Sequence, residues 1–119
     1  MLPLNEFQKE SRKTIFEWRH NGWYKDFPFE IYLRLDHHSI PSLGVVPCFT
    51  LSNIESKKMG SGKFIPLIVK LEKIAKERGA NFFFLENINN TRLIPKYENL
   101  GFSIISEEMG PPHGYKILR

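Results

Sequence analysis

The segment over residues 45–78 constrains the fold most, because it joins a strand pattern to a helix pattern through a short loop that contains Gly60 and Gly62. Residues 45–54 (VVPCFTLSNI) are typical of a strand. After the loop, apolar side chains recur at helical spacing, which predicts a helix over about 62–78. These apolar positions are Phe64, Leu67, Ile68, Leu71, Ile74 and Ala75. Such an order predicts a crossover that leads to a further strand of the same sheet.

The other elements follow from the same periodicities. Residues 29–36 alternate between apolar and polar side chains, so we expect them to pair with 45–54 as an antiparallel hairpin, with Pro47 near an edge, a bulge or the strand start. Residues 81–86 (NFFFLE) form a continuous apolar run, as expected of a strand buried on both faces. The remaining expected elements are a helix over 4–20, a turn or short helix over 23–28, a turn over 37–44, a helix from 89–90 to Leu100 that begins late or bends at Pro95, and strands over 102–106 and 115–119.

This order of elements predicts an α/β (α+β) fold with a mixed, mostly antiparallel sheet and helices on both faces. With 119 residues, 41% of them hydrophobic and 25% charged, the chain is expected to form one domain over 1–119 rather than a disordered segment. Ten phenylalanines suggest a small core filled by large side chains, and some of them could serve the interface of a homodimer.

Several classes of protein are disfavoured by what the sequence lacks. Cys48 is its single cysteine, so neither an internal disulfide framework nor a multi-cysteine zinc site is expected. His37 and His38 are neighbours whose side chains should point apart, and we expect no metal. No apolar stretch is long enough to cross a bilayer and no signal-peptide pattern opens the chain, so the expected location is the cytoplasm.

The formal net charge of +4 would suit an anionic partner. Lys57, Lys58 and Lys63 concentrate this charge around the glycine loop. No stripe of basic residues interleaved with aromatic residues is present, so nucleic-acid binding is the weaker explanation and a phosphorylated small molecule the better one.

The glycine loop itself suggests where phosphates would bind. Backbone N–H groups at a helix start are unpaired, the helix dipole favours negative charge there, and glycines let the backbone approach a phosphate closely. The loop is not a nucleotide P-loop, because Lys57 stands where that motif needs glycine and Phe64 where it needs serine or threonine. A three-glycine dinucleotide fingerprint is absent as well.

The spacing from Lys57 to Gly62 resembles the acyl-CoA pyrophosphate loop of the GNAT (GCN5-related) N-acetyltransferases, although that family prefers arginine or glutamine at the first position. A second stretch stands at the family's downstream offsets: Asn90, Leu93, Tyr97, Gly101 and Phe102. Leu93 replaces the usual alanine. The resemblance covers about 45–106 and implies a truncated GNAT-like fold, most similar to the small members known from phages, which would place it in the host cytoplasm.

The resemblance also implies an activity and a set of site residues. It implies transfer of an acetyl group from acetyl-CoA, as co-substrate, directly to an amine of a protein (a lysine or the N-terminus) or of a small molecule. Tyr97 would be the general acid, Glu86 the preferred proton acceptor and Glu55 the second choice. The expected cofactor-binding residues are Ser52, Asn53, Ile54, Lys57, Lys58, Met59, Gly60, Ser61, Gly62, Lys63 and Asn90.

Two alternatives stay open at this stage. The departures at Lys57 and Leu93 and the short N-terminal part would also suit a GNAT-like fold that binds a partner protein and no longer catalyses. A small basic nucleic-acid-binding protein is the other alternative, and its binding would weaken steeply with added salt.

Overall fold

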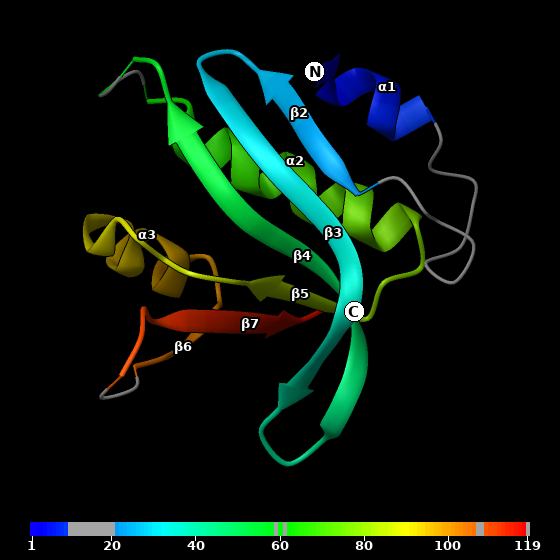
Figure 1. Ribbon diagram of the computed structural model, residues 1–119, viewed down its shortest axis with the longest axis vertical. Coiled ribbons are helices and arrows are strands. Elements are labelled where there is room, and N and C mark those ends of the chain that lie inside the picture. The colour runs from blue at the N-terminus through cyan, green and yellow to red at the C-terminus, as the bar shows by residue number, and fades with distance from the viewer. Residues whose placement is uncertain (10–20, 59, 61, 107–108, 119) are drawn as a thin grey trace.

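The computed structural model describes residues 1–9, 21–58, 60, 62–106 and 109–118 (Figure 1). These residues form a mixed sheet with the strand order β1-β2-β3-β4-β5-β7-β6, in which β1 is parallel to β2, β4 is parallel to β5, and the other neighbours are antiparallel. The α+β class and the mostly antiparallel mixed sheet predicted from the sequence are therefore confirmed. The strands are β1 Leu2–Pro3, β2 Gly22–Asp26, β3 Phe29–Ile40, β4 Gly44–Ser56, β5 Phe82–Leu85, β6 Ser103–Ile105 and β7 His113–Ile117, and the helices are α1 Leu4–Lys9, α2 Phe64–Glu77, the 3-10 helix η1 Thr91–Leu93 and α3 Ile94–Asn99.

The β3–β4 hairpin forms the centre of the sheet and is longer than predicted. The prediction of a turn over 37–44 was wrong for 37–40, which continue β3 and pair with 44–47 of β4. The turn is confined to the residues between Ile40 and Gly44, where Ser42 adopts a positive φ of 69°. Pro47 lies in the part of β4 beyond its pairing with β5, so its missing N–H costs no ladder bond on that side.

The prediction of a turn or short helix over 23–28 was wrong for 23–26 and is confirmed only for the turn at 27–28. Residues 22–26 form β2, which pairs antiparallel with β3 over its whole length. Trp23 and Tyr24 have large side chains with high strand propensity, and Tyr24 is buried in the core while Lys25 is exposed. Pairing with β3 therefore decides the structure of this segment.

The segment over residues 45–78, which constrains the fold most, folds as predicted. Helix α2 begins two residues after Gly62 and ends before Gly79, and the six apolar positions that predicted it are all buried. On β5, Phe83 and Leu85 face the main core while Phe84 joins a second cluster with Ile40 and Cys48. This strand is thus covered on both faces, as its apolar run predicted.

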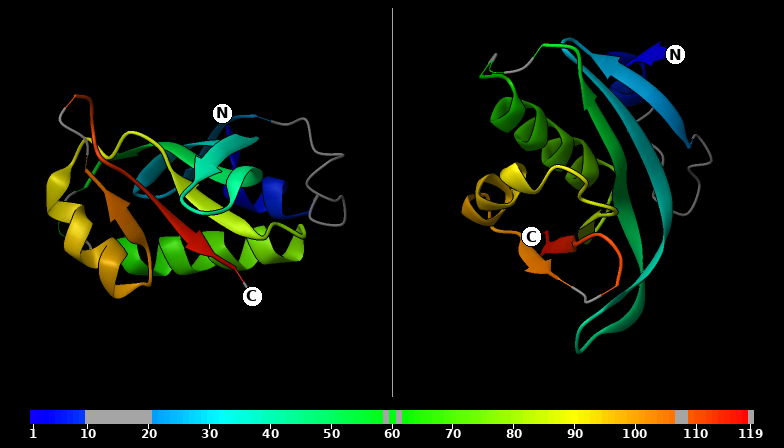
Figure 2. Two further views of the ribbon diagram at one scale, coloured as in Figure 1. Left: turned by 90° about the horizontal axis from the view of Figure 1, so that it is seen from below. Right: turned by 60° about the vertical axis from the view of Figure 1, so that its left-hand side comes forward.

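The described helices pack against one face of the sheet, whereas helices on both faces were expected. Figure 2 shows α2 and α3 on the same side of the curved sheet. Helix α1 joins them, because Phe7 contacts the ring of Phe49 and its carbonyl accepts a hydrogen bond from Arg78 at the end of α2. The N-terminal helix was predicted over 4–20, and its part beyond Lys9 lies outside the described residues.

The opposite face of the central strands carries polar side chains, which a helix could not cover without burying them. These residues are Tyr32, Arg34, Asp36 and His38 of β3, and Thr50 of β4 on the same face is already fully buried. None of the helices in the described residues is both long and apolar enough to span a membrane.

Candidate active site

Strands β4 and β5 run side by side only briefly and then diverge (Figure 1). Their pairing ends at Leu51 and Leu85, and the last bond between them runs from the Glu86 N–H to the Leu51 carbonyl, 3.0 Å. Asn87 then takes a φ of 53°, and the Ile88 N–H donates to the Pro112 carbonyl at 2.8 Å. The chain after β5 is therefore drawn toward β7, which leaves the β5-facing edge of β4 without a partner from that strand.

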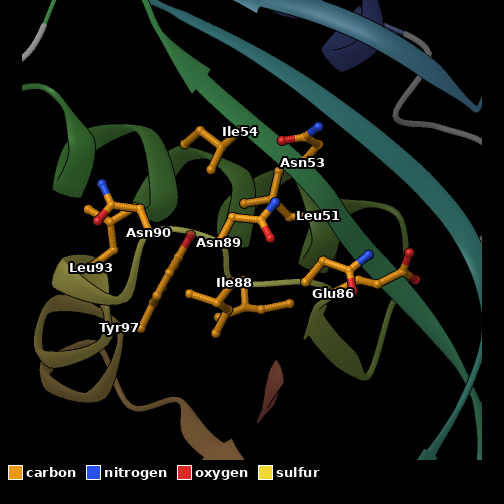
Figure 3. Close-up of a pocket in the computed structure, with 11 residues that line it drawn as sticks. Leu51, Asn53, Ile54, Glu86, Ile88, Asn89, Asn90, Leu93 and Tyr97 are labelled. Carbon is orange, nitrogen blue, oxygen red and sulfur yellow. The ribbon is translucent and has the colours of Figure 1, made fainter. Parts of the chain in front are cut away.

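A cavity of about 80 Å³ lies in this opening (Figure 3). Tyr97 and Glu86 lie at opposite ends of the cavity, and Asn89 lies between them. The cavity therefore offers one phenol and several amides beside a strand edge, and the Glu86 carboxylate at its far end is directed away from Tyr97. The lining residues are Leu51, Asn53, Ile54, Leu85, Glu86, Asn87, Ile88, Asn89, Asn90, Leu93 and Tyr97.

Tyr97 reaches the cavity from helix α3, and its ring is held edge-on by Phe64 and Phe102 at 5.2 and 5.6 Å. Only 2% of the residue is exposed. Burial raises the pKa of the Tyr97 phenol far above its usual range, because the charged phenolate would lose its hydration. At neutral pH the hydroxyl is therefore a stable hydrogen-bond donor.

The glycine loop borders a larger groove of about 320 Å³. Gly60 and Gly62 have φ values of 71° and 73°, which side-chain-bearing residues rarely adopt. Lys63 precedes helix α2 without a side-chain cap, and the first helical bond runs from the Leu67 N–H to the Lys63 carbonyl. The N–H groups of Phe64 and Ile65 in the first turn are therefore available to an anion, whereas Pro66 has none. The groove is lined by Phe29, Ile54, Ser56, Lys58, Gly60, Gly62, Phe64, Ile65, Asn90, Arg92, Leu93 and Lys96.

Cations from two segments line this groove. Lys58 comes from the glycine loop, and Arg92 and Lys96 come from η1 and α3 on the far side. The last two were missed by the sequence analysis, although they are four residues apart and follow Asn90 at the start of a helical segment. Lys57 and Lys63 do not line the groove: Lys57 Nζ lies 3.4 Å from Glu30 Oε1, and Lys63 lies over the Phe27 ring.

Among the other predicted cofactor-binding residues, some line the cavity and others do not. Asn53, Ile54 and Asn90 line the cavity in the opening, and Asn90 also caps η1, because its side chain accepts a hydrogen bond from the Arg92 N–H at 3.1 Å. Ser52 is the unpaired residue at an irregularity of the β3–β4 ladder. Met59 and Ser61 lie outside the described residues. Glu55 is exposed at the end of β4 and lines neither cavity.

Glu86 joins a polar cluster on the open face of the sheet. Its Oε1 lies 3.4 Å from both Arg34 Nη1 and Ser52 Oγ, and its Oε2 lies 3.6 Å from His38 Nε2. His38 Nε2 is also 2.9 Å from Asp36 Oδ1, which is close enough for an ion pair although the two are not aligned as a hydrogen bond. Glu86 therefore lines the cavity while its carboxylate lies in the cluster on the open face.

Asp36 contacts Arg34, His38 and Thr50 within this cluster. Burial acts to raise the pKa of Asp36, but contacts with His38 and Thr50 and the nearby charge of Arg34 outweigh it, so the pKa lies below its ordinary value. The carboxylate therefore stays ionised at neutral pH.

A lowered pKa of Asp36 makes its contribution to stability depend on pH. The ionised form stabilises the fold above the unfolded-state pKa of about 3.9, and this contribution is lost as the pH falls through the lower folded-state value. We therefore expect Asp36→Asn to be less stable than the wild type at pH 7, with the difference shrinking below about pH 4. Urea unfolding from pH 3 to pH 7 measures this difference, and a constant difference would contradict the ionic role of Asp36.

The cluster also bears on the expectation of no metal. Within the described residues, one ligand atom each from Asp36, His38 and Glu86 lie within 4.8 Å of one another. Arg34 already pairs with both carboxylates, with its Nε 3.7 Å from Asp36 Oδ2. A guanidinium supplies the positive charge that these carboxylates need, so we interpret the group as an ion-pair cluster, and the absence of a metal stays a prediction.

Comparisons with known proteins show the fold. No family model matches the chain, and a search of curated proteins finds no match. Among solved structures, a GNAT-family acetyltransferase of Listeria monocytogenes 4b F2365 is similar with a TM-score of 0.58 and 20% identity, over 78% of this chain and 59% of that chain. An acetyltransferase of Bacillus subtilis in complex with CoA has a TM-score of 0.57 and 15% identity, over 86% and 74%.

A third similar structure is a mutant of the AtaT toxin bound to the C-terminus of the antitoxin AtaR and acetyl-CoA, with a TM-score of 0.52 and 12% identity, over 76% of this chain and 58% of that chain. The chain thus spans less than two thirds of the Listeria and AtaT proteins. At these identities the likeness shows that the chain has a GNAT acetyltransferase fold.

Proposed function

We propose that this protein is an acetyl-CoA-dependent N-acetyltransferase that moves an acetyl group directly to an amine. One observation carries the proposal: the groove beside the glycine loop and the cavity between β4 and β5 share Ile54, Asn90 and Leu93 in their linings. The groove and the cavity are therefore adjacent, and together they extend from a positively charged helix start to Glu86. The two ends suit a pyrophosphate and an amine respectively.

In this proposal the cofactor lies along the groove and the cavity. The pyrophosphate binds the amides at the start of α2, and Lys58, Arg92 and Lys96 neutralise its charge. The amide-bearing pantetheine arm pairs with the β4 edge that β5 leaves free beyond Leu51. The fold likeness to proteins solved with CoA or acetyl-CoA supports the same ligand.

The chemistry begins at the amine. An ammonium group gives its proton to Glu86, and the neutral amine then attacks the thioester carbonyl, so that a C–N bond forms and the C–S bond breaks. An N–H group of the free β4 edge can stabilise the negative charge that develops on the carbonyl oxygen. The attacking nitrogen then loses its second proton to solvent, and the products are an amide and CoA.

Tyr97 has a narrower role here than the general acid predicted from the resemblance. A thiol has a pKa of about 8.5, so the CoA thiolate is a weaker base than a tyrosinate whose pKa is raised by burial. Complete proton transfer from Tyr97 to the thiolate is therefore uphill. We propose that Tyr97 donates a hydrogen bond to the leaving sulfur and that the thiol is completed from solvent.

Calorimetry with acetyl-CoA tests the cofactor site. We expect binding that weakens as salt is added, and Arg92→Ala should reduce the affinity roughly tenfold, in line with the loss of one charge-assisted hydrogen bond. Lys73→Ala is the matched control, because Lys73 is an exposed cation of α2 that does not line the groove. No binding at tens of micromolar protein, or equal losses in both variants, would contradict the site.

Transfer is measured separately with radiolabelled acetyl-CoA and a panel of amines, short lysine peptides and cell lysate. Label that appears on an acceptor supports the enzyme. Tight binding of acetyl-CoA without transfer to any acceptor would favour the alternative of a GNAT-like fold that binds a partner protein. Salt-sensitive binding of DNA or RNA for which CoA does not compete would favour the nucleic-acid-binding alternative.

A further inference from the structure

The β3–β4 hairpin extends beyond the strands that flank it (Figure 1). Strand β2 pairs with β3 only as far as Leu33, and β5 pairs with β4 only from Phe49 onward. Residues 34–48 therefore form a two-stranded hairpin arm whose outer edges have no strand partner among the described residues. An unpaired strand edge presents a row of backbone donors and acceptors, which can add a strand from another chain.

The two edges of the hairpin arm differ. On the β4 side the Leu51 carbonyl points toward β5, so by strand alternation the backbone of Pro47 also faces this edge. Proline has no N–H to donate, which protects the β4 edge against a further strand.

The β3 edge has no such protection. The Leu35 N–H points outward and donates to Asn21 Oδ1 at 2.8 Å, so the backbone groups of His37 and Ser39 point outward as well. In the part of the chain that the structure describes, no strand pairs with these two residues on that side. The β3 edge is therefore the one that is open to pairing.

We propose that the β3 edge of the hairpin arm pairs antiparallel with the same edge of a second copy of this chain, about a two-fold axis at His37. The two sheets then join into one. This inference goes beyond the proposed function and does not depend on it.

The backbone geometry suits an axis at His37. Outward-pointing residues form the hydrogen-bonded pairs of an antiparallel ladder, so His37 exchanges both of its bonds with its counterpart. The Ser39 N–H of each copy donates to the Leu35 carbonyl of the other, while the Leu35 N–H keeps its bond to Asn21. Both copies contribute the same bonds, as a two-fold interface requires.

The charges on the open face select this register. An axis at His37 places the ionised Asp36 of each copy directly opposite the imidazole of His38 of the other, where cross-strand side chains lie closest. An axis at residue 36 would set the two carboxylates against each other and would need Leu33, which already pairs with Gly22. An axis at residue 38 would set His38 against itself. The chain is thus complementary to a second copy of itself in one register.

The hairpin arm is held in place before any partner arrives. Ile40 is 1% exposed and packs with Cys48 and Phe84 in the second cluster. The His38 ring stacks on Phe84, with centroids 3.8 Å apart and an interplanar angle of 6°. Because the arm is anchored on β5, its edge is presented as a formed strand and pairing costs little ordering entropy.

Cysteine variants test the register. The matched pair is His37→Cys and Ser39→Cys, two exposed positions on the same edge. Residues at the axis have Cα atoms about 5.5 Å apart, which a disulfide can bridge, whereas the two copies of residue 39 lie about 13 Å apart. The native Cys48 is buried and does not compete. We expect mild oxidation to link His37→Cys into a covalent dimer and to leave Ser39→Cys unlinked, as read by mass spectrometry.

Proline variants test the edge. Ser39 and Val45 are opposite each other in the β3–β4 ladder, and both N–H groups point away from that ladder, so proline at either position removes no bond within the hairpin arm. Sedimentation velocity from micromolar to hundreds of micromolar protein should show a concentration-dependent dimer in the wild type. Ser39→Pro should raise the dimer Kd at least roughly tenfold, and Val45→Pro should leave it within about twofold. Circular dichroism checks that both variants fold.

A wild type that sediments as a monomer at every concentration would overturn the proposal and would leave the β3 edge to a strand of a different protein. Equal linking of the two cysteine variants would overturn the register, because collision rather than pairing would then explain the disulfide. An unchanged dimer in Ser39→Pro, or a dimer in which His37→Cys does not link, would place the interface elsewhere. If Ser39→Pro does not fold, the cysteine pair decides alone.

Discussion

Glu86→Gln is expected to lower kcat about a hundredfold to ten-thousandfold, the usual contribution of a positioned general base. The amide cannot accept the proton of an ammonium group, while its size and its contacts with Arg34 and Ser52 are nearly unchanged. The affinity for acetyl-CoA should therefore stay close to that of the wild type. Steady-state rates at saturating acetyl-CoA, together with calorimetry, separate the two effects.

Glu55→Gln is the informative comparison, because Glu55 was the second proton acceptor suggested by the sequence. Glu55 is exposed and lies across the ladder from Glu30, outside both linings, so its loss should change kcat far less than the loss of Glu86. If the order of the two variants is reversed, the assignment of Glu86 is wrong even though the fold is right. Equal rates in Glu86→Gln and the wild type would have the same meaning.

The cofactor half of the site could be predicted because its signals are local in sequence. Two glycines at a fixed distance from a helix start need positive φ values, and Asn90 can cap a helix wherever the sheet lies. Arg92 was missed because nothing in the sequence shows which side of a short helix faces the loop. That side is set by the packing of Tyr97 against Phe64.

The polar cluster could not be predicted because it is assembled across three strands. His38 meets Glu86 only if β3, β4 and β5 pair in one particular register. The turn expected over 37–44 hid this further, because it removed His38 from the strand. Once β3 runs to Ile40, strand alternation alone puts Arg34, Asp36 and His38 on one face.

The error at β2 has a similar cause. The segment at 22–26 lies next to Pro28 and includes charged residues, and its local sequence offers no clear period. Its strand structure comes from pairing with β3, since Tyr24 is buried opposite Ile31. Tertiary pairing of this kind overrides local propensity in short strands.

Phe83→Ala is the substitution expected to destabilise the fold most. The side chain is fully buried, and its ring contacts those of Phe49 and Phe102, both with centroids 5.2 Å away. Removing a buried phenylalanine costs about 3–5 kcal/mol, because contacts are lost and a cavity remains. Domains of this size have a free energy of unfolding of about 5–15 kcal/mol, so much of the stability would disappear. Urea unfolding followed by circular dichroism measures the loss.

Phe82→Ala is the matched control on the same strand, because Phe82 is only partly buried and packs against the second cluster on the opposite face. We expect it to lower the free energy of unfolding clearly less than Phe83→Ala. The reverse order would mean that β5 is shifted by one residue, since such a shift exchanges the two faces of a strand. Phe84 and Glu86 would then leave the open face, so this stability measurement also tests the geometry that places the Glu86 carboxylate beside Arg34 and His38.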